Sequence, residues 1–460
     1  SIWRSIKNKM TKILQKANDF INKKPKRSKK KKKNIIYSFL IKIINIFVVL
    51  ATVSISIKLL GAENYGIWIV LAGIITWSNL FNLGFSNGLK NKLAESLAKD
   101  DFSKGQYYVS TTYAFLIIIS IVIFSIFSLI AYNINWQSLL NITSLDNFTI
   151  ASVLMIIITF FCIQFILGPI TSILEAHQWP SIGQLISLIS AIIILLILFL
   201  QNGSKSLSEY AYLVAGIPVL ILFFASIYFF VTRFKSIRPT LKKIKLEYFS
   251  SLSKMGIAFF ILQLNAIIIL QTDNMIISNI FGPEKVTEYN IAQRYFGLII
   301  TFFIVLIAPF WSAITDAYTK EDFNWIKRVM KKLMMYVLFS CFVVGLMYLV
   351  SDWFYVLWIG ESIKIDSKLS LFMGIYVIVF CYVSIFAHFL NGVGKLKIQL
   401  IINSIGAIIN IPLSYFFAST SLGLSGVIIA TICSIGIIGI LTSIQTYKII
   451  NKTAINIWNK

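Results

Sequence analysis

Charged residues are scarce in this sequence of 460 residues. Asp, Glu, Lys and Arg together make up 13%, whereas 57% of the residues are hydrophobic and the mean hydropathy is +0.81. A soluble protein of this length needs far more polar side chains to cover its surface. The composition therefore excludes an ordinary soluble globular protein and predicts an integral membrane protein.

Histidine and cysteine are also rare, with two and four copies. The cysteines lie singly inside apolar runs, so their spacing indicates neither a disulfide framework nor a metal site. The histidines have no cysteine or carboxylate cluster at ligand spacing. A glycine-rich nucleotide-binding loop is missing as well, which argues against direct ATP hydrolysis. We expect no metal and no bound cofactor.

Apolar runs long enough to cross a bilayer recur from residue 35 to residue 450. A transmembrane helix needs about 20 apolar residues, and these runs lack the alternation of barrel strands. The expected fold class is an all-α membrane protein with about twelve transmembrane helices. The predicted spans lie at 35–60, 65–89, 107–132, 148–175, 180–201, 208–232, 255–281, 286–314, 328–353, 367–392, 396–418 and 422–447.

Basic residues gather ahead of the first span. Residues 1–33 contain fourteen Lys or Arg and one acid, so they hold +13 of the formal net charge of +24. Basic residues beside a span stay in the cytoplasm, and an even number of spans then places both termini there. We interpret 1–33 as an amphipathic segment held to anionic lipids of the inner leaflet; nucleic acid is not expected as its partner.

The two halves of the chain carry matching segments. GAEN begins at residue 61 and GPEK at 282, while KDDF begins at 99 and KEDF at 320; both separations are 221. ISLISAII and INSIGAII begin at 186 and 402, a separation of 216. We therefore predict two pseudo-symmetric six-helix lobes around a central cleft. The expected segments are 1–33, an N-terminal lobe at 34–233, a cytoplasmic linker at 234–254, a C-terminal lobe at 255–450 and a cytoplasmic tail at 451–460.

Two charged residues stand out inside the apolar runs, Asp273 and Arg294. They flank the predicted outer connection GPEK at similar distances, so two antiparallel helices would bring them to nearly the same depth. A lone charge there costs about 3 kcal/mol or more, which a partner or a water-filled cleft relieves. Two interpretations stay open: an interhelical ion pair, or Arg294 facing an anionic substrate with Asp273 as counter-ion or ion-coupling site.

The other candidate substrate contacts lie in the first two predicted spans. Lys42 lies about two turns inside the first span, where it either extends to the inner interface or faces the cleft. Asn79, Asn82 and Lys90 recur at helical spacing, and such a polar stripe must face protein or water. We treat these four residues and Arg294 as candidate substrate-binding residues.

The segment that holds Asp273 and Arg294 resembles a known family. TDNMIISNIFGPEKVTEYNIAQR, at 272–294, is similar to the seventh-to-eighth span segment of bacterial polysaccharide repeat-unit flippases, within the multidrug/oligosaccharidyl-lipid/polysaccharide exporter superfamily. KLLGAENYGIW and FNLGFSNGLKNKLAESLAKDD resemble two further segments of that family. In the latter, Asn82 stands where the family frequently has Asp.

This resemblance implies a function. It implies a two-lobed flippase, not an enzyme, that moves undecaprenyl-diphosphate-linked oligosaccharide across the bacterial cytoplasmic membrane by alternating access. It also implies coupling to a proton or sodium gradient, and polysaccharide polymerase and chain-length proteins as further partners.

Two other functions remain alternatives at this point. A multidrug or small-cation antiporter of the same superfamily would favour an acidic cleft, but few carboxylates lie inside the spans. A membrane polysaccharide polymerase or acyltransferase would need a folded outer loop or a cluster of His, Arg and carboxylates, and the predicted outer connections are short.

Overall fold

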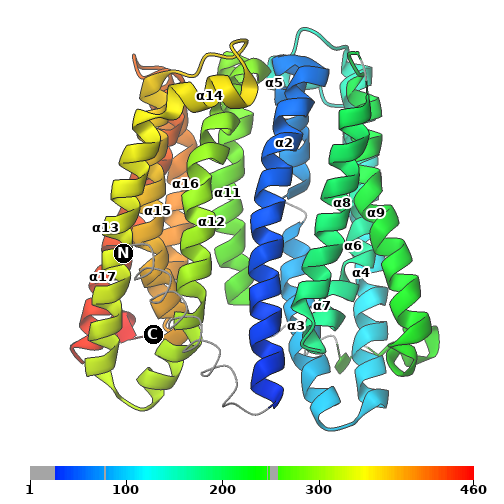
Figure 1. The fold of residues 1–460 in the computed structure, drawn as a ribbon, viewed down its shortest axis with the longest axis vertical. Coiled ribbons are helices and arrows are strands. Elements are labelled where there is room, and N and C mark those ends of the chain that lie inside the picture. Colours follow the sequence, from blue (N-terminus) through cyan, green and yellow to red (C-terminus); the bar gives the residue numbers. More distant parts are fainter. Residues whose placement is uncertain (1–25, 77–78, 202, 246, 249–256, 460) are drawn as a thin grey trace, which may run out of the picture.

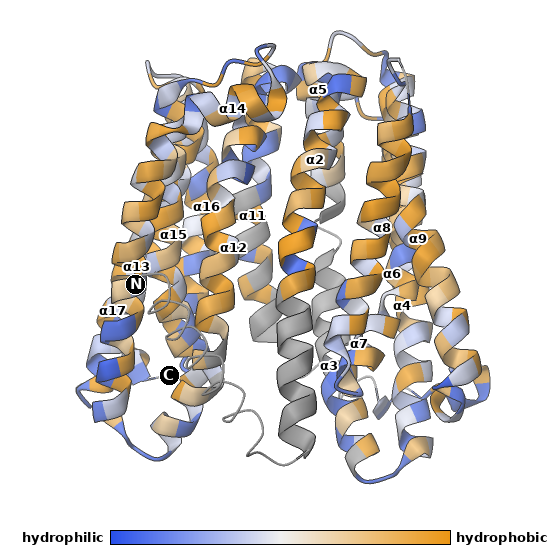
Figure 2. Ribbon diagram, in the orientation of Figure 1, coloured by the Kyte–Doolittle hydropathy of each residue, from blue (hydrophilic) through white to orange (hydrophobic). Residues whose placement is uncertain are grey.

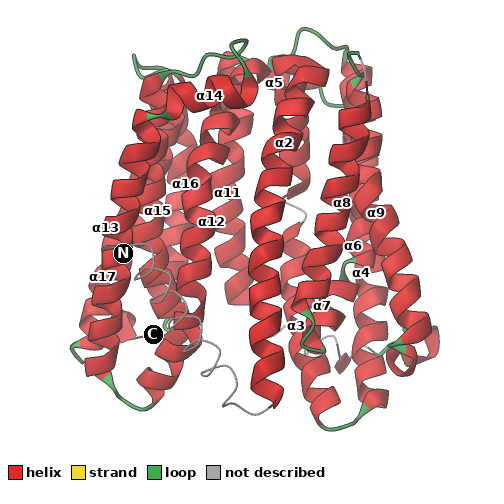
Figure 3. Cartoon of the chain, in the orientation of Figure 1, coloured by secondary structure: helices red, strands yellow, loops and turns green. Residues whose placement is uncertain are grey.

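The protein is an all-helical bundle in the computed structural model. The described residues contain no strand (Figure 3). Helices form because the long apolar runs satisfy their backbone hydrogen bonds internally, as a bilayer requires. The structure describes residues 26–76, 79–201, 203–245, 247–248 and 257–459, without the side chains of 26–39, 74–87, 98, 257–260, 263, 266–267, 270, 309 and 312.

The helices form two groups that stand side by side, which confirms the predicted two-lobed all-α fold (Figure 1). The N-terminal lobe comprises α2 (Lys26–Thr76), α3 (Asn79–Ala98), α4 (Phe102–Ala131), α5 (Trp136–Leu140), α6 (Asn147–Leu167), α7 (Pro169–Ala176), α8 (Pro180–Leu200) and α9 (Leu207–Thr232). The C-terminal lobe comprises α11 (Ile257–Phe281), α12 (Pro283–Thr319), α13 (Phe323–Leu349), α14 (Ser351–Ile359), α15 (Ser367–Val393), α16 (Lys397–Ala418) and α17 (Leu424–Ile450).

Ten segments of the described residues are long and apolar enough to cross a membrane. Hydrophobic residues dominate the middle of the helices, and hydrophilic residues gather toward the two ends of the bundle (Figure 2). Exposed Ile, Leu and Phe side chains on α4, α8, α9 and α13 fit contact with lipid tails. The molecule is therefore a multi-pass membrane protein, while the number twelve stays a prediction.

The predicted turn GAEN lies inside α2, which is two helices joined at Gly61. Gly61 has φ 79° and ψ 164°, which is not helical. Gly282, which separates α11 from α12, has nearly the same backbone with φ 87° and ψ 165°. Positive φ values of this kind favour glycine. Beyond the second predicted span, 65–89, the helix α3 continues to Ala98.

Other backbone features repeat at the separation that relates GAEN to GPEK. Asp101 caps α4 by accepting from the backbone N–H of Lys104, and Asp322 caps α13 by accepting from that of Trp325. The residues before the two caps, Asp100 and Glu321, have φ values of 55° and 56°. Such agreement in caps and turns is expected if the halves are copies of one unit.

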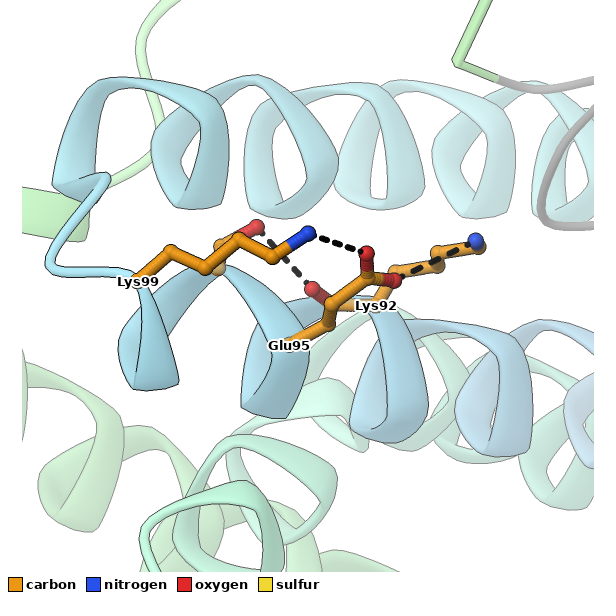
Figure 4. Close-up of polar contacts among 4 residues, drawn as sticks. Lys92, Glu95 and Lys99 are labelled. Atoms are coloured by element: carbon orange, nitrogen blue, oxygen red, sulfur yellow. Dashed lines mark hydrogen bonds and ion pairs between the residues drawn. The ribbon is translucent and has the colours of Figure 1, made fainter.

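An ion pair repeats as well. Lys99 Nζ lies 2.9 Å from Glu95 Oε1, and Lys92 Nζ lies 3.5 Å from Glu95 Oε2 (Figure 4). The hydrogen bond from Lys99 holds the pKa of the Glu95 carboxyl below its usual value. At the equivalent positions of the C-terminal lobe, Lys320 Nζ lies 2.8 Å from Asp316 Oδ2.

The lobes are joined near the turns at Gly61 and Gly282. There Thr287 Oγ1 donates to the Ala62 carbonyl at 2.6 Å, and Ser278 Oγ donates to the Leu140 carbonyl at 2.6 Å. Eleven residues before Gly61 on α2, the Leu50 carbonyl accepts a hydrogen bond from Trp358 Nε1 of α14 at 2.8 Å. At Gly66 the two backbones come so close that an added Cβ would lie 1.8 Å from the carbonyl oxygen of Pro283. The lobes are thus closed against each other at this end.

Candidate functional site

Arg294 lies on α12 and reaches across to the N-terminal lobe. Its guanidinium interacts with the hydroxyl of Tyr65, which lies four residues beyond the turn of α2. Tyr65 is only 3% exposed. Behind it, the Tyr210 hydroxyl is hydrogen-bonded to Ser56 Oγ at 2.7 Å, and the Tyr210 ring packs edge-on against Trp68 at 5.0 Å. Arg294 therefore contacts a polar, aromatic surface of the opposite lobe.

The guanidinium has hydrogen-bonding capacity left over. Arg294 is half-buried, and its Nε is buried without a hydrogen-bond partner among the described residues. An Arg with unused donors at a lobe interface suits a phosphate, because the planar fork matches two oxygens of the anion at once.

Asp273 lies deep in the C-terminal lobe. It is 1% exposed, and its Oδ2 accepts from the Tyr289 hydroxyl at 2.8 Å and from Thr431 Oγ1 at 3.0 Å. Oδ1 is buried and finds no partner in the described part of the chain. The ion pair with Arg294, one of the two interpretations of the sequence, is therefore wrong. Asp273, on α11, is hydrogen-bonded to Tyr289 of α12 and Thr431 of α17, whereas Arg294, on α12, contacts Tyr65 of α2.

A buried polar cluster surrounds Asp273. Asn410 Nδ2 donates to Thr431 Oγ1 at 3.2 Å and to Ser434 Oγ at 3.4 Å. Like Asp273 Oδ1, the oxygens Asn410 Oδ1 and Ser414 Oγ are buried without partners among the residues that the structure describes. Sequence reasoning missed these residues, although one signal was present: Asn410 and Ser414 stand one turn apart inside an otherwise apolar span. A buried carboxylate that Thr431 links to Asn410, each with an unpartnered oxygen, suits a proton or a small cation.

Lys42 is exposed on α2. The exposed apolar residues nearby, Leu40 and Ile44, lie two positions away, so at about 100° per residue they occupy the opposite face of the helix. Eleven residues further along, Val53 shares the face of Lys42 and is buried in the protein. Lys42 thus lies on the protein-facing side of α2, at the end away from the joined turns, which favours the cleft over lipid.

Lys90 has a partner that the sequence did not suggest. Its Nζ lies 2.8 Å from Glu175 Oε2 of α7, and the two side chains are 43% and 41% exposed. Glu175 follows the break between α6 and α7 at Gly168 and Pro169, so only the fold of that break brings it to α3.

Asn79 and Asn82 belong to α3, and their side chains lie outside the described residues. The structure brings α11 against α2 and α3. Among the described residues, no group of three or more His, Cys, Asp and Glu could hold a metal ion.

Comparison with protein families identifies the fold and its relatives. A family model described as "Polysaccharide biosynthesis protein" matches residues 32–314, more than half of the chain. The chain belongs to the Polysaccharide biosynthesis protein family. A second model, MatE, matches residues 255–416.

Two curated proteins are similar to this chain over most of their own length. A putative O-antigen transporter of Salmonella typhimurium is 27% identical over 413 residues, covering 86% of this chain and 91% of the relative. A putative O-antigen export protein of Yersinia pseudotuberculosis is 24% identical over 365 residues, covering 77% of this chain and 82% of the relative.

Solved structures share the fold at low identity. The inward-facing conformation of a multidrug resistance MATE family transporter of the MOP superfamily has a TM-score of 0.77 and 16% identity, covering 91% of this chain and 98% of the other. An outward-facing structure of such a transporter has a TM-score of 0.66 and 16% identity, covering 92% and 96%. The protein therefore shares the fold of these transporter structures.

Proposed function

We propose that this protein is a flippase that translocates undecaprenyl-diphosphate-linked oligosaccharide repeat units across the bacterial cytoplasmic membrane by alternating access. The family match and the names of the curated relatives support a role in O-antigen export. The substrate is moved without being chemically changed. Both termini lie in the cytoplasm, and polymerase and chain-length proteins take up the exported units.

The observation that carries this proposal is the position of Arg294. Its guanidinium lies between the lobes, contacts Tyr65 and has an Nε that no described residue pairs. When the lobes separate at this end, Tyr65 stays with the N-terminal lobe and the guanidinium becomes free. A diphosphate takes its place as partner, because Arg binds phosphate oxygens in pairs. Lys42, on the protein-facing side of α2, supplies a second cation toward the other end.

The substitution Arg294→Ala tests this role. We expect it to reduce surface polysaccharide export to background in a deletion strain that carries the variant, and Arg294→Lys to keep part of the export, since Lys keeps the charge without the fork. Immunoblots should show wild-type amounts of protein in the membrane. The control is Arg328→Ala, at an exposed position of α13. Full export by Arg294→Ala removes this residue from the mechanism.

The polar cluster of Asp273 is the ion-coupling site in this proposal. A fully buried carboxylate with an oxygen that no described residue pairs is costly unless it binds a proton or a cation. Its hydrogen bonds to α12 and α17 couple its charge to the packing of the C-terminal lobe. A proton or sodium gradient would thereby drive the lobe between two arrangements.

Export of drugs or small cations is the second candidate, because the MatE model matches 255–416. Overexpression in a drug-sensitive strain separates the two functions. A drug exporter raises resistance to cationic drugs, whereas a flippase leaves resistance unchanged and restores surface polysaccharide in the deletion strain.

A further inference from the structure

The C-terminal lobe contains a cavity of about 590 Å³ that has no role in the transport steps proposed above. It lies among α11, α12, α15, α16 and α17, toward the end of the lobe opposite the Gly282 turn. Its volume falls in the range of pockets that hold small organic ligands and is far larger than an ion requires. Apolar side chains form most of the wall, and three amide side chains interrupt it: Asn391, Gln399 and Asn403.

The carbonyl oxygens of all three amides are buried and have no hydrogen-bond partner within the described part of the chain. Gln399 is the most enclosed of them, with 5% of its surface exposed. Buried acceptors normally have a partner, because an unpaired one destabilises the fold. As placed, the three oxygens are shielded from the cavity, so a donor in it reaches them once the amide groups turn. Three such unpaired acceptors in the wall of one cavity suit a ligand that donates several hydrogen bonds as it enters.

The lining also limits the charge of such a ligand. Among the described residues, no Asp, Glu, Lys or Arg borders the cavity, so a charged ligand would lose its hydration without gaining a counter-ion. Trp311 adds an aromatic surface. A neutral molecule with hydroxyl donors and apolar C–H faces meets these conditions, and a sugar ring is such a molecule.

The N-terminal lobe has different residues at the equivalent positions. The offset between GAEN and GPEK relates Lys90 to Trp311, and the offset between ISLISAII and INSIGAII relates Glu175 to Asn391. An ion pair in one lobe thus corresponds to an aromatic and an amide in the other. The second offset also makes Gly183 and Ser187 of the N-terminal lobe the sequence equivalents of Gln399 and Asn403. The amide set is therefore particular to the C-terminal lobe and is not a by-product of the repeat.

We propose that this cavity binds one neutral sugar unit, whose hydroxyl groups donate to Asn391, Gln399 and Asn403 while its ring packs against Trp311. The proposal deepens the proposed function and rests on it for the source of the sugar, which would be the lipid-linked oligosaccharide. The cavity would hold part of the glycan while the diphosphate is bound elsewhere.

Saturation-transfer NMR on the purified full chain in lipid nanodiscs tests this binding. The probes are the methyl glycosides of glucose, galactose, N-acetylglucosamine and rhamnose. We expect saturation transfer to the ring protons of at least one glycoside. The double variant Gln399→Leu with Asn403→Leu should weaken that binding about 100-fold, at about tenfold for each lost hydrogen bond. The matched control is Gln164→Leu, in a smaller cavity of about 370 Å³ in the N-terminal lobe, which should bind as the wild type does.

Four results would overturn the proposal. The first is no transfer to any glycoside, and the second is equal binding by the double variant. The third is a melting temperature that rises with sodium chloride in the wild type but not in the double variant, which would assign a cation instead. The double variant should melt no lower than the wild type, because it removes unpaired buried acceptors; a large drop would show a structural role and also count against the site. Binding is measured without transport, so this outcome is independent of whether Arg294→Ala loses export.

Discussion

Asp273 and Arg294 of the C-terminal lobe correspond, at the offset between GAEN and GPEK, to Thr52 and Gly73 of the N-terminal lobe. Thr52 donates to the Val48 carbonyl of its own helix at 2.7 Å, and Gly73 has no side chain to offer. Turns and caps match between the lobes, whereas charges inside the membrane do not. The lobes therefore share the features that shape the backbone and differ in the buried charges that we propose for ion and substrate binding.

The same contrast holds at the end of the bundle away from the joined turns. There the N-terminal lobe has the ion pair of Lys90 and Glu175, and the C-terminal lobe has Trp311 and Asn391 beside a cavity whose described lining is uncharged. We infer that the C-terminal lobe carries the ion-coupling and sugar contacts, while the N-terminal lobe provides the surface against which Arg294 closes.

The largest effect is expected from Asp273→Asn, compared with Thr52→Val at the matched position. Asp273→Asn keeps the side chain's shape but removes the charge that we propose to couple to the gradient, so export should fall to background. Thr52→Val loses only a hydrogen bond within its helix, and export should stay near wild type. Both variants are scored for surface polysaccharide at equal membrane levels. Equal export by the two variants would contradict an asymmetric coupling site.

A smaller but clear effect is expected from Gly66→Val, which adds side-chain atoms where the backbones of the lobes touch. The added Cβ would lie 1.8 Å from the Pro283 carbonyl oxygen, so the closed end should be destabilised by about 1–3 kcal/mol. The disulfide yield between cysteines introduced at Ala62 and Thr287 should fall. Gly297→Ala is the control, since an added Cβ there meets no described atom within 4 Å. An unchanged yield would show that this contact does not hold the lobes together.

The smallest effect is expected from breaking the ion pair of Lys90 and Glu175. Each side chain is more than one-third exposed, so Lys90→Gln or Glu175→Gln should change stability by less than about 1 kcal/mol. The exchange of both, Lys90→Glu with Glu175→Lys, should restore the wild-type melting temperature. Loss of export by Lys90→Gln but not by Glu175→Gln would instead assign Lys90 to the substrate, as the sequence first suggested.

Much of the architecture could be predicted, because long apolar runs in a bilayer have few alternatives to helices. The matched segments GAEN and GPEK also located the turns at Gly61 and Gly282. The candidate site was harder. Distance from the turn suggested similar depths for Asp273 and Arg294, but the structure pairs Asp273 with Tyr289, five residues before Arg294 on α12. Depth also does not determine which neighbour a side chain faces.

The sequence by itself determined that this protein is a helical membrane protein built from two related halves, since hydropathy and repeat spacing act along the chain. Only the tertiary structure decided the partners: Arg294 with Tyr65, Asp273 with Tyr289 and Thr431, and three amides around one cavity. The physical reason is that each partner lies on another helix, whether the next one along the chain, as for Asp273 and Tyr289, or one far away in sequence, as for Arg294 and Tyr65. Its approach depends on how the helices rotate and pack, which local patterns do not specify.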